Sequence, residues 1–270
     1  MSLQKFIQST FRGILHDRYV AKLIKPDSLS VYSQCFTSSE INSENNYEYF
    51  EQLGDVSANK FLVWYFYKRF PQLECAKGVK VVARLKINEG SKKSFSSMAR
   101  DLGFWDQIRA TDEEKVRDPD SLLEDVFEAF IGGTEYLLDK NVHRGIGNIA
   151  VGDFLAHHWD KRKISLKYED LFDSKTRLKE LFDRYPELGR VKYRDFQDRA
   201  PDRPTVSTCK IYRQVPSQRP FLFAQAQSRL KGDAQRAAAT QALKKLNQQG
   251  WVKEAPEEYA RFQNVSSIQL

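Results

Sequence analysis

Two short stretches of the chain carry acidic residues whose spacing fits metal-dependent cleavage of phosphodiester bonds. Glu48, Glu51 and Asp55 are three and four residues apart, so on a helix their carboxylates lie on one face. Asp125 and Glu128 are three residues apart and would share a face of a second helix. Two such helices side by side would gather the oxygen ligands that hard divalent cations prefer, with positions left open for phosphate oxygens.

The neighbours of these acids favour a functional site over the ordinary alternative, a solvated helix face. An apolar run at 60–67 follows the first stretch, and apolar residues at 122–131 surround the second. Carboxylates in such surroundings are costly unless something compensates them, and a metal ion is one solution. Gly54, Gly132 and Gly133 lack side chains and would let helices or a ligand approach closely.

The composition is that of a folded protein with an acidic partner. The chain has 270 residues, 41% hydrophobic, and a net charge of +7, which favours nucleic acid. Cys35, Cys75 and Cys209 are too few and too scattered for a disulfide framework, so we expect reduced thiols and an intracellular, most simply cytoplasmic, location. No secretory signal is recognisable, and the longest apolar run, 61–67, is too short for a membrane span.

The elements that must position the acids are predicted to be helices, and residues 1–165 are interpreted as one mostly helical domain. Asn45 or Asn46 can cap a helix that begins near Tyr47 and ends before Pro71. The turn at 118–121 launches a second helix that runs from Leu122 to Leu138. Further helices are predicted at 80–87, 91–102 and 151–160.

The sequence pattern changes after a charged linker at 166–172. Residues 173–247 show a helix at 175–182, strands at 191–196, 205–212 and 221–227, and an alanine-rich helix at 233–246. Ala234, Ala237, Ala238 and Ala242 would form a flat face suited to lying on a sheet. This α-β-β-β-α order predicts a small, separate α+β module, followed by a tail at 248–270.

Basic residues cluster around the start of that last helix. Arg229, Lys231 and Arg236 flank its N-terminus, where backbone N–H groups also attract phosphate. Arg203, in the predicted turn between the first two strands, is a candidate second contact. The alternatives are a solvated helix face and a turn kept soluble by its charge.

Taken together, these motifs resemble the ribonuclease III family. Residues 47–55 match the family signature Asn-Glu-Arg-Leu-Glu-Phe-Leu-Gly-Asp, and residues 124–129 match its second acidic motif, Ala-Asp-Ala-Phe-Glu-Ala. Residues 35–38 and 94–103 resemble two further segments of the same domain. The second module resembles a double-stranded-RNA-binding domain, whose closing helix usually begins Ser-Lys-Lys-x-Ala; residues 230–234 stand there.

The resemblance implies a mostly α-helical endonuclease domain followed by a small α+β RNA-binding domain, acting as a homodimer on double-stranded RNA. It implies that Glu51, Asp55, Asp125 and Glu128 hold Mg²⁺, for which Mn²⁺ can substitute, and that Glu48 supports them. The expected products carry a 5′-phosphate and a 3′-hydroxyl. The resemblance also implies that the second domain binds double-stranded RNA by its A-form shape more than by its sequence.

The chain departs from the family pattern at four positions that bear on function. Lys77 stands roughly where the family often has a glutamate near the active-site valley. Gln52 replaces the signature phenylalanine, which in the family fills a socket in the partner subunit, so dimer strength and partner identity stay open. Gly232 replaces one of two phosphate-binding lysines, and Leu230 replaces a serine. Two alternatives therefore remain: a catalytically inactive structural or RNA-binding subunit, and a subunit that pairs with a different chain of the family.

Overall fold

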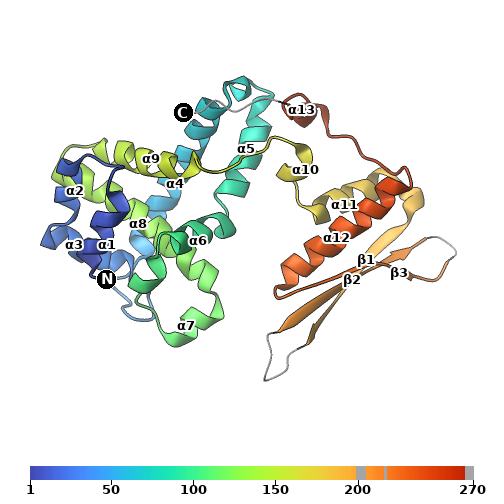
Figure 1. Cartoon of the computed structure of the whole chain (residues 1–270), viewed down its shortest axis with the longest axis horizontal. Coiled ribbons are helices and arrows are strands. Elements are labelled where there is room, and N and C mark those ends of the chain that lie inside the picture. The colour runs from blue at the N-terminus through green and yellow to red at the C-terminus, as the bar shows by residue number, and fades with distance from the viewer. Residues whose placement is uncertain (199–204, 216–217, 265–270) are drawn as a thin grey trace. The chain divides into compact units, whose positions relative to one another are not determined.

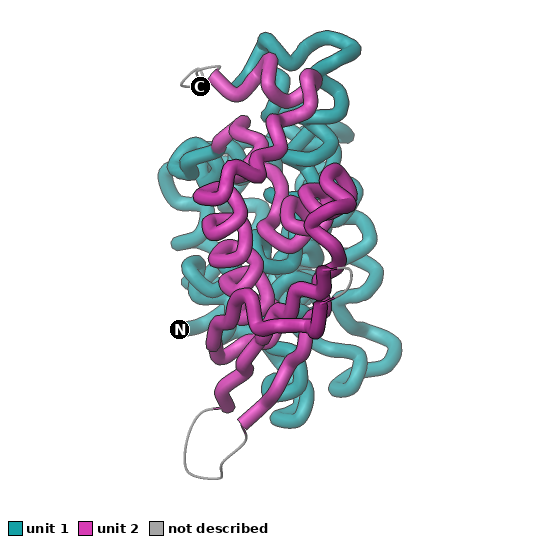
Figure 2. Tube along the Cα trace, turned by 90° about the vertical axis from the view of Figure 1, so that its right-hand side faces the viewer, with its two compact units in different colours: residues 1–164, 265–270 teal, residues 165–264 magenta. Residues whose placement is uncertain are grey.

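The structure is a computed structural model that describes residues 1–198, 205–215 and 218–264. It divides into two compact units, unit 1 (Met1–Ile164) and unit 2 (Ser165–Asn264), teal and magenta in Figure 2. Unit 1 is helical and unit 2 combines helices with a three-stranded sheet, which confirms the predicted fold class. All three cysteines are free thiols. None of the helices in the described part of the chain is long and apolar enough to cross a membrane.

Unit 1 is built from helices joined by turns and loops (Figure 1). Its elements are α1 (Leu3–Phe11), α2 (Asp17–Leu23), α3 (Pro26–Cys35), α4 (Glu48–Arg69), η1 (Pro71–Leu73), α5 (Gly78–Glu89), α6 (Lys92–Asp101), η2 (Phe104–Gln107), α7 (Asp112–Arg117), α8 (Pro119–Asn141) and α9 (Ile146–Trp159).

The predicted helices of unit 1 are confirmed, although α8 and α9 begin three and five residues earlier than predicted. α4 ends just before Pro71, and α8 begins at Pro119 behind its cap Asp118, whose side chain accepts the N–H of Ser121 at 3.1 Å. α9 begins at Ile146, five residues earlier than predicted. The side chain of Asp139 explains this start, because it accepts the N–H groups of Gly145 at 3.0 Å and of Gly147 at 2.7 Å.

α8 forms the centre of unit 1. It is buried at every position from Val126 to Thr134, as expected of a helix that is covered on all sides. The ring of Phe130 stacks on Phe11 at 5.2 Å and meets the edge of Phe104 at 4.9 Å. α4, α6 and α9 all pack against this helix. The acids of α8 are therefore attached to a helix that the rest of the unit packs around.

The crossing of α4 and α8 is closer than ordinary side chains permit. A Cβ atom at Gly54 would stand 1.8 Å from the carbonyl oxygen of Glu128, and one at Gly132 would stand 2.1 Å from the carbonyl oxygen of Phe50. Both glycines therefore allow two backbones to touch. This confirms the predicted role of Gly54 and Gly132 and brings the two acidic stretches together.

Unit 2 has helices on one side of an antiparallel sheet of strand order β1-β2-β3 (Figure 1). Its elements are α10 (Tyr168–Leu171), α11 (Ser174–Arg184), η3 (Pro186–Leu188), β1 (Arg190–Asp198), β2 (Val206–Gln214), β3 (Phe221–Ser228), α12 (Lys231–Gln248) and α13 (Glu257–Ala260). The predicted α-β-β-β-α order is thus present from α11 to α12.

The alanine face of α12 differs from the prediction at one residue. Ala234, Ala238 and Ala242 are buried against the sheet and α11, but Ala239 is buried with them, whereas Ala237 is exposed. The buried set follows the spacing i, i+4, i+5 and i+8, which is the stripe that a straight helix lays on a flat surface.

Unit 2 also takes in the residues predicted as linker and tail. Leu166, Tyr168 and Leu171 are buried, and so is Phe262 near the end of the described chain. The Lys253 ammonium donates to Glu180 Oε2 at 2.6 Å, and the Tyr168 hydroxyl donates to the same oxygen. The charged residues next to these apolar side chains in the sequence led to the prediction of a linker and a tail instead of buried segments.

Candidate active site between two acidic helices

α4 presents its three acids from its first two turns. The side chain of Asn46 accepts the N–H of Glu48 at 2.9 Å and so stabilises the start of the helix, as predicted. Glu51 is half-buried, whereas Glu48 and Asp55 are exposed. Asp55 Oδ1 accepts a hydrogen bond from the Asn59 amide at 2.6 Å.

α8 presents its acids on the side that faces α4. Asp125 is half-buried and Glu128 is buried, with 8% of its surface exposed. A buried carboxylate with no cation beside it is costly, because water no longer stabilises its charge. No hydrogen bond or ion pair to the Glu128 side chain was found in the described residues. Such a carboxylate is a candidate for binding a metal ion or a proton.

The electrostatics show that the structure brings the predicted acids together. Burial, followed by the charges of Asp55 and Glu124, raises the pKa of Glu128 to about 8. Burial, followed by the charges of Asp125 and Glu48, raises the pKa of Glu51 to about 7. The two helices therefore hold an excess of negative charge in one place.

Glu124 is a member of the cluster that the sequence interpretation did not single out. It is half-buried on α8, and burial and the charge of Asp125 raise its pKa to about 6, against a lowering by Lys92. The signal was present in the sequence, because residue 124 is an acid where the family motif has alanine. We call Glu48, Glu51, Asp55, Glu124, Asp125 and Glu128 the acidic cluster.

Tyr47 is a second residue that the interpretation missed. Its hydroxyl donates to Asp125 Oδ2 at 3.3 Å, and it stands where the family signature has asparagine. Burial raises the pKa of Asp125, and the Tyr47 hydrogen bond opposes that rise. Local spacing could not reveal a contact between residues 78 positions apart. The bond fixes one carboxylate of α8 to the start of α4.

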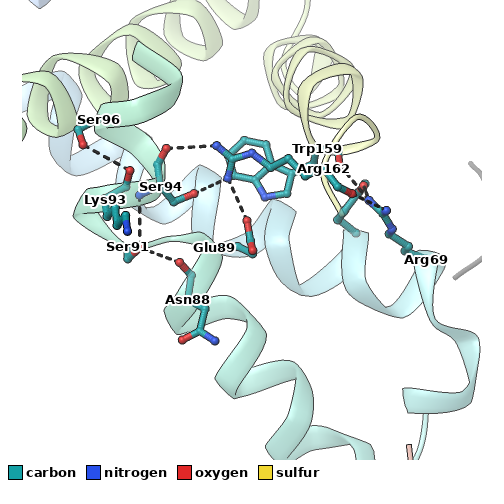
Figure 3. A network of polar contacts seen from close by, with 10 residues as sticks. Arg69, Asn88, Glu89, Ser91, Lys93, Ser94, Ser96, Trp159 and Arg162 are labelled. Atoms are coloured by element: carbon teal, nitrogen blue, oxygen red, sulfur yellow. Dashed lines mark hydrogen bonds and ion pairs between the residues drawn. The ribbon is translucent and has the colours of Figure 1, made fainter. Parts of the chain in front are cut away.

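A network of polar contacts fixes the turn between α5 and α6 (Figure 3). The Arg162 guanidinium donates to Glu89 Oε2 at 2.9 Å and to the Ser94 hydroxyl at 2.5 Å, and it lies 4.7 Å above the Trp159 ring. Arg69, in the last turn of α4, donates to the carbonyl oxygens of Trp159 at 2.9 Å and of Arg162 at 2.8 Å. The ends of α4 and α9 are thus tied to the start of α6.

This network holds a lysine beside the acidic cluster. Lys92, the first residue of α6, lies with its Nζ 3.2 Å from Asp118 Oδ2. The N–H of Ser121 and then the Lys92 ammonium lower the pKa of Asp118. Burial raises the pKa values of Glu124 and Asp125, and the same ammonium opposes that rise. One cation thus offsets only part of the negative charge there.

The donor set fits a hard divalent cation by its chemistry. Carboxylate oxygens are the ligands that Mg²⁺ accepts, together with water and phosphate. As the side chains stand, no three His, Cys, Asp or Glu residues in the described ranges converge tightly enough to form a ready-made metal site. The fit therefore rests on an accumulation of carboxylates that repel one another and that a cation would stabilise.

The predicted RNA-binding residues of unit 2 lie around the start of α12, apart from Arg203, which is outside the described residues. Arg229 is exposed. Lys231 Nζ lies 3.2 Å from Asp195 Oδ2, and the Arg236 guanidinium pairs with Asp233. Both cations are therefore partly neutralised within the protein.

Gln52 is exposed on α4 and lies beside a row of exposed apolar side chains. Tyr49, Leu53, Val56 and Trp64 follow one face of the helix, and Val56 and Trp64 each leave 64% of their surface exposed. An apolar row of this kind on a soluble helix is typical of a surface that contacts another protein.

Known proteins resemble this chain over most of its length. The family model described as Ribonuclease III domain matches residues 48–137, from the first residue of α4 into the last part of α8. A candidate ribonuclease 3 of Invertebrate iridescent virus 6 is 40% identical over 274 residues, which cover 96% of this chain and 92% of that protein.

Two further relatives match a smaller part of this chain. A candidate ribonuclease 3 of Frog virus 3 (isolate Goorha) is 39% identical over 247 residues, 88% of this chain but only 61% of that protein. The Ribonuclease 3 of Ligilactobacillus salivarius (strain UCC118) is 31% identical over 204 residues, 74% of this chain and 80% of that protein.

Proposed function

Because this chain belongs to the ribonuclease III family and is a ribonuclease III-type endonuclease, we propose that it cleaves double-stranded RNA with the help of Mg²⁺. The observation that carries the proposal is the acidic cluster, in which Glu128 is buried among other carboxylates. The excess negative charge supports cation binding at the crossing of α4 and α8.

Four carboxylates would hold the cation: Glu51 and Asp55 from α4, and Asp125 and Glu128 from α8. The bound ion would supply an activated water and stabilise the leaving oxygen of the phosphodiester. Tyr47 would hold Asp125 in place, and Glu48, which is exposed, would orient water or RNA. The expected products carry a 5′-phosphate and a 3′-hydroxyl. Mn²⁺ accepts the same oxygen ligands and should substitute.

The start of α12 is the proposed contact to the duplex. Arg229, Lys231 and Arg236 would bind phosphates there, and Arg203 is proposed as a further contact. A Cβ atom at Gly232 would stand 3.7 Å from the Arg236 guanidinium. Arg236 can therefore place its charge near the position where the family usually has a second lysine.

The proposed partner is a second copy of this chain, bound through the exposed row on α4. Gln52 weakens the family contact, but Tyr49, Leu53 and Val56 offer apolar area around it. Sedimentation of Val56→Glu should show a shift toward monomer. Val116→Glu is the matched control, because Val116 is 82% exposed on α7 and should leave the dimer intact. A strict monomer for the unaltered chain would favour pairing with a different chain of the family.

A cleavage assay tests the catalytic proposal. Long duplex RNA incubated with the protein and Mg²⁺ should be cut, and Glu128→Gln should abolish cutting. Glu113→Gln is the control, since Glu113 is an exposed acid on α7 outside the cluster. Intact duplex under all metal conditions would favour the catalytically inactive alternative. Cleavage that survives Glu128→Gln would refute the assignment of the site.

A further inference from the structure

The sheet of unit 2 has an outer face that none of the described helices of the unit covers. α11 and α12 pack on the inner face, where Cys209, Ile211 and Ala224 are buried (Figure 1). Side chains alternate between faces along each strand. The outer face therefore carries Arg190, Lys192, Arg194, Phe196 and Asp198 from β1, Thr208, Lys210 and Tyr212 from β2, and Leu222, Gln225 and Gln227 from β3.

Cations and aromatic rings alternate on this face. Arg194 and Lys210 are directly opposite one another in the register of β1 and β2. Each cation instead lies over a ring of the neighbouring strand: Arg194 is 5.2 Å from the centre of Tyr212, and Lys210 is 5.3 Å from the centre of Phe196. Phe196 still leaves 50% of its surface exposed.

Like charges directly opposite one another destabilise a sheet. The stability of the sheet therefore does not explain why Arg194 and Lys210 face each other. Within the described strand residues, the carboxylates are Asp195 and Asp198. Asp195 lies on the helix side, where it pairs with Lys231, whereas Asp198 shares the outer face and lies beyond Phe196 at the end of β1. The outer face has four cations: Arg190, Lys192, Arg194 and Lys210. Their register partners are Gln214, Tyr212, Gln225 and, for the opposed pair, each other, none of them acidic. The middle of the face is therefore positively charged.

We propose that this face binds an unpaired nucleic-acid strand. Phe196 and Tyr212 would each stack one base, while Lys192, Arg194 and Lys210 would contact the adjacent phosphates. Phe196 is exposed and Tyr212 is half-buried. Aromatic rings interleaved with cations are the combination that holds single strands without sequence preference. The surface is separate from the start of α12, which lies on the other face of the sheet, and it requires no cleavage. It therefore goes beyond the proposed action on duplex RNA.

The test measures binding of fluorescent oligo(U) and oligo(dT) twelve-mers to the full chain in EDTA, so that no cleavage occurs. We expect saturable binding of oligo(U), with or without oligo(dT), that weakens as salt rises. Loss of both rings in Phe196→Leu/Tyr212→Leu should weaken it at least about 10-fold, given the usual contribution of base stacking. The control Arg229→Ala should weaken duplex binding and leave oligomer binding unchanged.

A second variant guards against misfolding. In this variant glutamine replaces Lys192, Arg194 and Lys210, which removes the repulsion between the opposed cations. The melting temperature of the protein should therefore stay the same, while its affinity for the oligomer should fall. Three results would each overturn the proposal: no saturable binding of either oligomer, equal binding by folded variants, or complete displacement of the oligomer by excess duplex. Retention of the oligomer by the duplex-bound protein would support two separate surfaces.

Discussion

Replacing Gly54 by alanine tests whether the close crossing of α4 and α8 builds the acidic cluster. The new Cβ would stand 1.8 Å from the carbonyl oxygen of Glu128 and 2.5 Å from its carbonyl carbon. The backbones must then separate by on the order of 1 Å to reach an ordinary contact distance. Overpacking against backbone costs about 3 kcal/mol, and the better helix propensity of alanine returns about 1 kcal/mol.

The expected net loss is therefore about 2 kcal/mol in the free energy of unfolding, or a melting temperature lower by about 4–8 °C. Cleavage should fall as well, because the carboxylates of Asp55 and Glu128 move apart. Thermal unfolding followed by tryptophan fluorescence would report on unit 1, where Trp159 is fully buried.

Gly152→Ala on α9 is the matched control. It is also a glycine within a helix, but a Cβ there would meet no atom within 4 Å. That substitution should stabilise the protein by about 0.5–1 kcal/mol and leave cleavage unchanged. Equal stability and equal cleavage of Gly54→Ala and the unaltered chain would refute the reasoning, since the crossing would then tolerate a side chain.

Three further predictions concern charge. The pKa of Glu128 is about 8 in the fold against 4.5 ordinarily, so the folded state keeps a proton that the unfolded chain releases. The metal-free protein should then lose stability as the pH rises from about 4.5 to 8. Glu128→Gln should flatten that slope in melts with EDTA; an unchanged slope would contradict the assignment. Tyr47→Phe removes the hydrogen bond to Asp125 and should lower kcat about 5-fold in a steady-state assay with labelled duplex, with little change in KM; an unaltered kcat would exclude a positioning role. Gly232→Lys restores a cation where the space is open, so duplex binding should tighten and the slope of log affinity against log salt should steepen by roughly 0.7–0.9 in a filter-binding titration. An identical slope would show that residue 232 does not reach a phosphate.

Local signals predicted the elements that carry the site. Pro71 marks the end of α4, and Asp118 with Pro119 marks the start of α8, because these residues act on the backbone beside them. The acid spacing and Gly54 also pointed to the crossing of two helices. These features depend on residues a few positions apart, which a sequence shows directly.

The features that were missed depend on contacts between distant residues. Tyr47 reaches Asp125 across 78 positions. Tyr168 is buried because the fold of unit 2 brings the segment around Lys253 against it, and Lys253 donates a hydrogen bond to its hydroxyl. The charged residues nearby suggested a linker, since spacing alone does not show which partner covers an apolar side chain.

β1 lies at the edge of the sheet, so one side of its backbone has no strand beside it among the described residues of unit 2. An edge nine residues long could pair with the same edge of another molecule and begin aggregation. Arg190, Lys192 and Arg194 occupy alternate positions of this strand, so a second β1 placed alongside would bring cations of two molecules together. The charge that we assign to nucleic-acid binding would therefore also keep separate molecules from joining their sheets.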